Sequence, residues 1–257
     1  MSVILAAIDN SAAARPVLDV ARELARVVGA DVETIHVDDG SGPPHAADAI
    51  ARSSHLPVQV KRGDIVPTIA ASAEARDAIA VVIGARAVPA GASPAGHVTM
   101  ELVQSLDIAV VVVPPQAVAR SLSRVLVAVE GDGESRVLRH ILEGLRPRHD
   151  LEIIALHVFE LDQLPMFADQ PVLETEAWAE EFGRRTLGVG EGKIRLEVRV
   201  GDAARTLAEV ARELDADLVA LAWHRDLTEG HGRLVRTVLA EADVPVLLLP
   251  ITGRNGR

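Results

Sequence analysis

Short runs of Val, Ile, Leu and Ala recur along the chain, and most are followed by a longer stretch whose apolar residues fall on one face of a helix. An apolar run of about 4–8 residues between polar or Gly/Pro residues is typical of a strand buried on both faces. Strands that alternate with amphipathic helices indicate right-handed βαβ units and a parallel sheet. The pattern predicts ten strands, at about residues 3–9, 31–37, 57–62, 79–84, 108–113, 124–130, 151–158, 194–200, 217–223 and 244–249.

The helical pattern is clearest after the first and the eighth of these strands. After the first strand, Asn10 or Ser11 can cap a helix that ends at Gly29. After the eighth, Asp202 can cap another helix. In each helix the apolar residues form one stripe, as expected for a helix that packs on a core. The stripes are Val17, Ala21, Leu24 and Val28 in the first helix, and Leu207, Val210, Ala211 and Leu214 in the second.

The pattern of the first half is repeated in the second. Four pairs of matching positions follow in the same order: Asp9 and Glu130, His36 and His157, Gly63 and Gly201, and Pro114 and Pro250. The first two pairs are 121 residues apart, and the last two are 138 and 136 residues apart. Ordered matches with a single large change of spacing indicate a tandem duplication. We therefore expect two domains, residues 1–118 and 122–252, joined near residues 117–123.

The two halves differ between their second and third strands, where the second half is 17 residues longer. This predicts a full helix within residues 171–187, whereas the first half has only a short segment around residues 45–54. Both tryptophans, Trp178 and Trp223, fall in the second half.

Composition narrows the class of protein. The chain of 257 residues is 49% hydrophobic but only 2% aromatic, so its core must consist mainly of Ala, Val, Leu and Ile. The absence of cysteine excludes disulfides and thiolate chemistry. A formal net charge of -11 argues against a broad nucleic-acid or anionic-membrane surface. No segment approaches the roughly 20 apolar residues that span a bilayer. We expect a soluble cytoplasmic protein, with neither nucleic acid nor membrane as a partner.

Four features together resemble the universal stress protein family in its tandem two-domain form. They are a first strand that ends in Asp9, a second strand that ends in His36-Val37, a Gly63-Asp64 turn, and a glycine-bearing loop after the fourth strand. The resemblance implies an α/β fold with two doubly wound, five-stranded parallel sheets of order 3-2-1-4-5, similar to adenine nucleotide α-hydrolases. It further implies that the halves pack about a pseudo-twofold axis, with their fifth strands paired. A ligand would bind beyond the carboxyl ends of the first and fourth strands.

The glycine loop departs from the family's pattern. ATP-binding members of the family carry GxxG-x9-G[ST] after the fourth strand, where glycines let backbone N–H groups approach phosphate oxygens. Here residues 84–87 are Gly-Ala-Arg-Ala and residues 96–99 are Gly-His-Val-Thr, with a spacer of eight residues. Ala87 replaces the middle glycine, and His97 replaces Ser or Thr.

The resemblance implies particular site residues in the first half. Asp9 and the backbone of Val37 would lie at the adenosine end. The phosphate end would be formed by the loop residues Gly84, Arg86, Gly96, His97, Val98 and Thr99. The residues alone also allow another interpretation, in which Asp9 caps the next helix and the two glycines are ordinary loop residues. In the same interpretation, His36 and His157 are satisfied strand-end residues.

The second half is more degenerate. Glu130 stands in place of Asp9, and Trp223 lies in the region of the first glycine. An anion site here would be a rebuilt one, in which arginines supply charge-assisted hydrogen bonds. Its candidate residues are Glu130, Val158, Arg225, Gly232 and Arg233, with Arg236 nearby.

Other chemistry finds little support in the sequence. There is no GxxxxGK[ST], GxGxxG or GxSxG motif, and no catalytic residue is predicted. His224 and His231 flank a loop with Asp226 and Glu229, but their spacing matches no common zinc pattern, so we predict no metal site.

Three functions stay open. The resemblance favours a stress-response sensor or adaptor that binds ATP or AMP, with Mg²⁺ only alongside ATP, and acts on an unidentified protein partner. The alternative is an interaction module of the same fold that binds no nucleotide and no cofactor. The third is a slow nucleotide hydrolase, and a further homodimer between chains is compatible with each.

Overall fold

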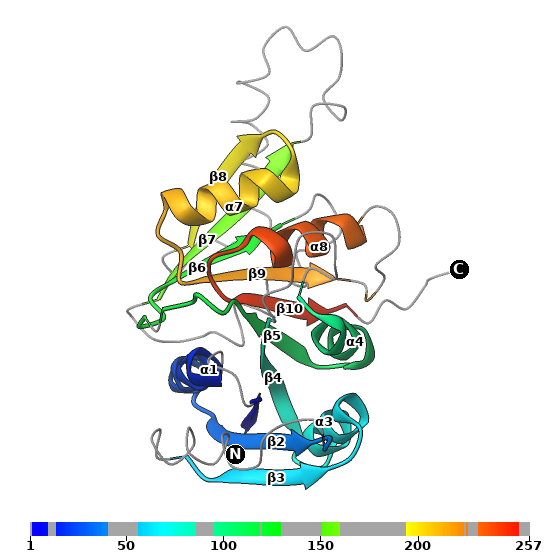
Figure 1. Ribbon diagram of the computed structural model, residues 1–257. Coiled ribbons are helices and arrows are strands. Elements are labelled where there is room, and N and C mark those ends of the chain that lie inside the picture. The colour runs from blue at the N-terminus through cyan, green and yellow to red at the C-terminus, as the bar shows by residue number, and fades with distance from the viewer. Residues whose placement is uncertain are drawn as a thin grey trace, which may run out of the picture.

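The computed structural model of the chain describes residues 2–9, 14–40, 56–85, 95–118, 120–129, 151–159, 194–223, 225 and 231–251 (Figure 1). The first half contains β1 (Val3–Ala7), α1 (Ala14–Val28), β2 (Asp31–Asp38), β3 (Val58–Arg62), α3 (Ile65–Glu74), β4 (Ala78–Gly84), α4 (His97–Ser105) and β5 (Ala109–Val113). The second contains β6 (Arg124–Ala128), β7 (Glu152–Phe159), β8 (Ile194–Val200), α7 (Ala203–Glu213), β9 (Leu218–Trp223), α8 (His231–Glu241) and β10 (Val246–Pro250). All ten predicted strands are confirmed.

The strands of the described part form one continuous sheet of order β3-β2-β1-β4-β5-β10-β9-β6-β7-β8. Each half therefore has the predicted order 3-2-1-4-5, and all neighbours within a half are parallel. The two halves meet where β5 pairs with β10 in the antiparallel direction. This pairing removes the apolar edge that each half would otherwise present to solvent.

The register of β5 with β10 has twofold symmetry. Val111 lies opposite Leu247, the residue 136 positions later that matches it in the repeat. Val110 and Val112 lie opposite Leu248 and Val246, so the pattern reads the same from either half. An interface in which each residue faces its own counterpart is that of a C₂ dimer. The tandem chain thus has the pseudo-twofold arrangement that the sequence predicted.

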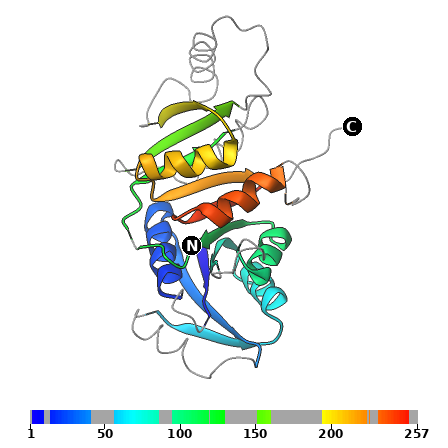
Figure 2. The ribbon, with the colours of Figure 1, turned by 45° about the horizontal axis from the view of Figure 1, so that its top comes forward.

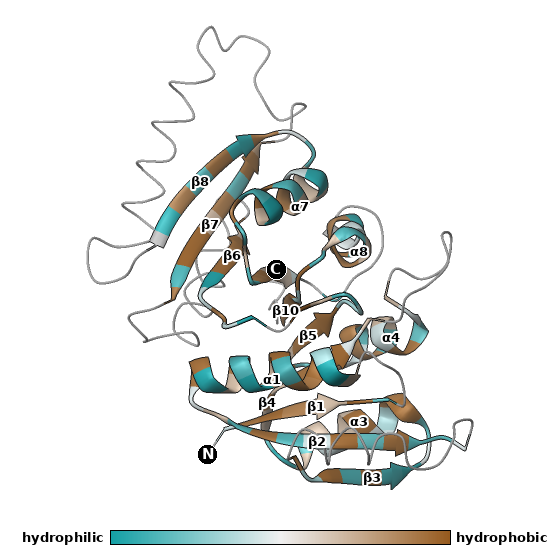
Figure 3. Cartoon of the chain, turned by 60° about the vertical axis from the view of Figure 1, so that its left-hand side comes forward, coloured by the Kyte–Doolittle hydropathy of each residue, from teal (hydrophilic) through white to brown (hydrophobic). Residues whose placement is uncertain are grey.

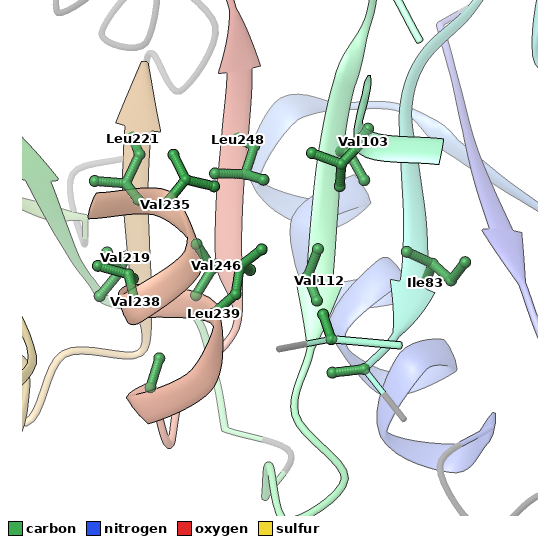
Figure 4. Packing of buried hydrophobic residues seen from close by; sticks show 14 of the residues in the cluster. Ile83, Val103, Val112, Val219, Leu221, Val235, Val238, Leu239, Val246 and Leu248 are labelled. Atoms are coloured by element: carbon green, nitrogen blue, oxygen red, sulfur yellow. The ribbon is translucent and has the colours of Figure 1, made fainter. Parts of the chain in front are cut away.

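Two apolar clusters cover the two faces of the sheet, and both extend across the joint. Val110, Val112, Val246 and Leu248 belong to the cluster beneath α3, α4, α7 and α8, and Figure 4 shows Val246 and Leu248 beside residues of α8. Val111 and Leu247 point to the other face, where α1 packs. Figure 3 shows the corresponding hydropathy, with apolar central strands and a polar outer stripe on α1. Because each cluster contains residues of both halves, neither half buries its fifth strand alone.

The helices of the second half follow the prediction where they are described. Asp202 caps α7, because its carboxylate oxygen accepts a hydrogen bond from the backbone N–H of Arg205 at 3.0 Å. Helices α7 and α8 lie side by side along the sheet (Figure 2). The predicted cap of α1 at residues 10–11 and the predicted helix within residues 171–187 lie outside the described residues.

The segment that links the two halves, residues 122–124, is hydrogen-bonded to both of them. One carboxylate oxygen of Asp217, at the start of β9, accepts bonds from the N–H and hydroxyl of Ser123 and from the N–H of Arg124, at 2.8–2.9 Å. On the other side, Glu23 of α1 accepts a bond from the N–H of Leu122 at 3.3 Å.

Within the described residues, no helix is long and apolar enough to cross a membrane.

Candidate functional site

A cavity of about 410 Å³ opens at the carboxyl ends of β1, β2 and β4 in the first half, between the starts of α1, α3 and α4. This is the end of an open α/β sheet at which ligands bind. Of the eight site residues predicted in this half, seven line the cavity: Asp9, Val37, Gly84, Gly96, His97, Val98 and Thr99. The eighth, Arg86, lies outside the described residues.

One part of the cavity wall is apolar. Ile35, Ile69 and Ile83 contribute buried side chains, and Val37 is 9% exposed. Asp9 is exposed at the rim, two residues after the end of β1. Apolar walls with a few well-placed polar groups are typical of small-molecule sites, and this volume lies within the range of about 300–1,000 Å³ that such sites have.

The backbone of Val37 is directed toward this part of the cavity. The carbonyl of Ile35 accepts a hydrogen bond from the N–H of Ile8 at 2.9 Å, so the backbone N–H and C=O of Ile35 are directed toward β1. Alternate residues of a strand direct their backbone groups to the same neighbour. The N–H and C=O of Val37 therefore point past the end of β1, where a planar ligand can bond to them.

The start of α4 forms the polar end of the cavity. Gly96 precedes the helix with φ 88° and ψ 156°, a conformation that residues with a Cβ rarely adopt. The first helical hydrogen bond runs from the N–H of Met100 to the carbonyl of Gly96, and no side chain caps the helix within the described residues. The N–H groups of His97, Val98 and Thr99 consequently have no acceptor inside the helix. Such a terminus attracts anions.

The side chains of Thr99 and His97 have other partners. The Thr99 hydroxyl is buried and donates to the carbonyl of Gly84 at 3.1 Å, which ties the start of α4 to the end of β4. The His97 ring is 90% exposed and lies 3.6 Å from Glu101 on the next turn. These two residues can therefore meet an anion through their backbone N–H groups, whereas the sequence motif pointed to a side-chain hydroxyl.

His36 and His157 make the same contact in the two halves. Nδ1 of His36 is 2.9 Å from the carbonyl oxygen of Ile8, and Nδ1 of His157 is 2.9 Å from that of Val129. Each ring joins the end of a second strand to the end of its first strand. The contact is that of a satisfied strand-end residue, which is one of the two interpretations that the sequence allowed.

The second half differs from the first at the corresponding helix. Helix α8 begins at His231, so Gly232 lies inside the helix, and Gly232 is not among the described glycines with positive φ. The expected equivalence of Gly232 with Gly96 therefore does not extend to backbone conformation. The reason is that α8 starts two residues earlier than α4 relative to the repeat, before the glycine instead of after it.

The arginines of the second half are engaged in ion pairs. Arg225, which has φ 59°, pairs with Asp107 of the first half. Arg233 lies 3.5 Å from Asp202, the cap of α7. Val158 is partly buried and packs against the core, and Glu130 lies outside the described residues. In the part of the chain that the structure describes, the two predicted arginines are thus each paired with a carboxylate from another element.

Sequence reasoning missed several residues that line the first-half cavity, such as Ile65 and Pro115. They carry no motif, and only their position at strand and helix ends could have indicated them. It also missed a second cavity of about 330 Å³ at the joint, between α1, the linker and the starts of β9 and β10. Among the residues described, no group of three or more His, Asp and Glu could hold a metal ion.

Comparison with known proteins gives a consistent result. A model of the Universal stress protein family matches residues 122–250, about half of the chain. The crystal structure of a universal stress protein from Archaeoglobus fulgidus matches with a TM-score of 0.65 and 16% identity, over 99% of this chain and 97% of that one. A functionally unknown protein from Pseudomonas aeruginosa matches with a TM-score of 0.68 and 16% identity, over 97% and 92% of the two chains. These two likenesses show the fold. No curated protein matches the chain.

Proposed function

Because this chain belongs to the universal stress protein family, we propose that its first half binds one adenine nucleotide, AMP or ATP, and that the protein acts as a nucleotide-dependent sensor or adaptor in a stress response. The observation that carries the proposal is the convergence of residues from distant parts of the chain on one cavity. Asp9 and Val37 come from the first two strand ends, and residues 96–99 come from the start of α4.

The apolar end of the cavity suits a nucleoside. Ile35, Ile69 and Ile83 offer apolar surface to a purine ring, and the backbone of Val37 offers one donor and one acceptor to its edge. The carboxylate of Asp9 accepts hydrogen bonds, which matches the hydroxyls of a ribose.

The polar end suits a phosphate. The three N–H groups at the start of α4 point their partial positive charge at the cavity, and a phosphate oxygen would supply the acceptors that the helix lacks. ATP would bring Mg²⁺ bound to its own phosphates, and Asp9 is the only carboxylate among the described lining residues that could help to hold it.

A sensor must pass the state of its site to another surface, and the chain has a direct connection for this. Asp107 follows α4 closely, and it pairs with Arg225, which lies just after β9 of the second half. A movement of α4 on nucleotide binding would therefore reach the second half through this ion pair. This connection supports a role as an adaptor more than a role as an enzyme.

One observation favours a second candidate, the interaction module that binds no nucleotide. Among the described residues that line the cavity there is no Lys or Arg, so a phosphate would be neutralised by backbone dipoles alone. A weak phosphate site favours AMP, which has one phosphate, over ATP. If the site is too weak to hold any phosphate, the protein binds no nucleotide.

The first experiment is to denature the purified protein, which has been given no nucleotide, and to analyse the supernatant by mass spectrometry. The proposal predicts an adenine nucleotide at up to one mole per mole of chain. An empty supernatant, followed by no thermal shift with millimolar AMP or Mg·ATP, would contradict it and support the second candidate.

The second experiment changes the start of α4. Gly96→Asp places a carboxylate where we expect the phosphate, and it should weaken nucleotide binding at least about tenfold, equal to ~1.4 kcal/mol. Gly96→Asn imposes the same backbone strain without the charge, so it should bind better than Gly96→Asp. Gly29→Asp is the matched control, because Gly29 also has a positive φ (72°) but ends α1 away from the cavity. Equal affinities for Gly96→Asp and Gly96→Asn would contradict an anion at this place.

A further inference from the structure

Strand register identifies which residue of the second half corresponds to each residue of the cavity. In the first half, Gly84 of β4 pairs with Val113 of β5. In the second, Ala222 of β9 pairs with Leu249 of β10, and Leu249 is the counterpart of Val113 at the 136-residue offset of the fifth strands. Ala222 therefore occupies the place of Gly84, and Trp223 occupies that of Ala85.

Trp223 points to the same face of the sheet as its counterpart. Ala85 lines the first-half cavity and is 6% exposed. Trp223 is 2% exposed and belongs to the same apolar cluster as Leu221 and Val235, which Figure 4 shows packed against each other between β9 and α8. The largest side chain in the sequence is thus buried at the strand end where the first half has a methyl group and a cavity.

One other replacement in the cluster of Trp223, that of Thr99 by Val235, also makes the second half more apolar. Val235 stands where the first half has Thr99, whose hydroxyl bonds to the end of β4, and Leu207 stands where it has Ile69. Both are buried in the cluster that contains Trp223, and Val158, the counterpart of Val37, packs against that cluster. At the places of Ala85 and Thr99 the second half thus has a larger and a less polar side chain, whereas Leu207 and Val158 are apolar like their counterparts Ile69 and Val37.

We propose that the Trp223 side chain fills the crevice of the second half and so restricts ligand binding to the first half. Residue 85 or 223 then decides in each half whether the crevice is a ligand site or core. The first part of the proposal, that Trp223 fills the crevice, is argued from the packing alone. The second part, that this restricts the nucleotide to the first half, rests on the proposed function. The two parts are tested separately.

The filling is tested by removing the indole. Trp223→Ala should leave an apolar cavity that binds free indole, as engineered apolar cavities bind small aromatic molecules. Saturating indole should raise the melting temperature of this variant by about 2–4 °C. Wild type, in which the indole of Trp223 already occupies this space, should show no shift. A folded Trp223→Ala variant that gains no stability from indole would overturn the proposal, whatever the nucleotide results are.

The selection is tested by the reciprocal change. Ala85→Trp should lower the affinity of the first half for AMP at least about tenfold while the protein stays folded, and Ala85→Ser is the matched control that keeps the space open. If wild type binds AMP and Ala85→Trp binds it with the same affinity, the proposed role of residue 85 in selecting the ligand site is overturned. If wild type binds no nucleotide, the proposed function fails, and the indole experiment still decides the filling. If Trp223→Ala does not fold, Trp223→Leu replaces it in the indole experiment.

Discussion

The hydroxyl of Thr34 is buried on β2 with no hydrogen-bond partner among the described residues, and the residue is 1% exposed. A buried polar group without a partner costs stability, so its replacement by an apolar group of the same shape is favourable. We expect Thr34→Val to raise the free energy of unfolding by about 1 kcal/mol in urea denaturation.

Thr99→Val provides the opposite case for comparison. The Thr99 hydroxyl is equally buried but donates to the carbonyl of Gly84, so its loss should lower the free energy of unfolding by about 1 kcal/mol. If both variants are destabilised alike, the Thr34 hydroxyl has a partner and this account of it is wrong.

At the scale of single residues, the candidates of the first half lie together at one cavity, whereas the two arginines of the second half lie in separate ion pairs. Asp9, Val37 and residues 96–99 follow from a motif, and they line one cavity. Arg225 and Arg233 were expected to face an anion, but they pair with Asp107 and Asp202. Asp107 is 118 residues from Arg225. Partners this distant are set by the tertiary fold and cannot be foreseen from local spacing.

The two glycine turns before α3 and α7 offer a test at the scale of elements. Gly63 has φ 134° and Gly201 has φ 155°. A Cβ at Gly201 would lie 2.8 Å from the Thr206 hydroxyl, whereas one at Gly63 would lie 3.2 Å from the Thr68 hydroxyl. We expect Gly201→Ala to lower the free energy of unfolding by about 2–3 kcal/mol, and Gly63→Ala to lower it by about 1–2 kcal/mol.

The difference between the two turns should come from the threonine. In a Thr206→Ala background, the cost of Gly201→Ala should fall toward that of Gly63→Ala, because only the backbone strain is left. Denaturation of the four single and double variants measures this. A larger cost for Gly63→Ala than for Gly201→Ala would contradict the contact as the cause.

Strands were predicted more closely than helix ends. Buried parallel strands are continuous apolar runs, and their ends fall within about two residues of the predicted ones because charged or Gly/Pro residues bound them. The start of α8 is less clearly marked in the sequence. His231 and Gly232 gave no cap signal to separate a helix beginning before the glycine from one beginning after it. That two-residue difference distinguishes the start of α8 from that of α4.

For the whole molecule, the pairing of β5 with β10 is the central feature, and we propose residues 1–118 and 122–252 as the domains that it joins. A polypeptide of residues 1–118 would expose Val110, Val111 and Val112, which are at most 2% exposed in the chain. Because Val111 already lies opposite its counterpart, two copies can pair through β5 about the same axis. We expect this polypeptide to be a dimer by light scattering, and a folded monomer would contradict the proposed boundary.

The measurement that tests the central claim most directly is a calorimetric titration of the whole chain with AMP, repeated with Mg·ATP. If the first half carries the site and Trp223 fills the crevice of the second, the stoichiometry is one nucleotide per chain, and Gly96→Asp removes the binding. Two nucleotides per chain, or one that Gly96→Asp and Ala85→Trp both leave unchanged, would place the site elsewhere and contradict the account.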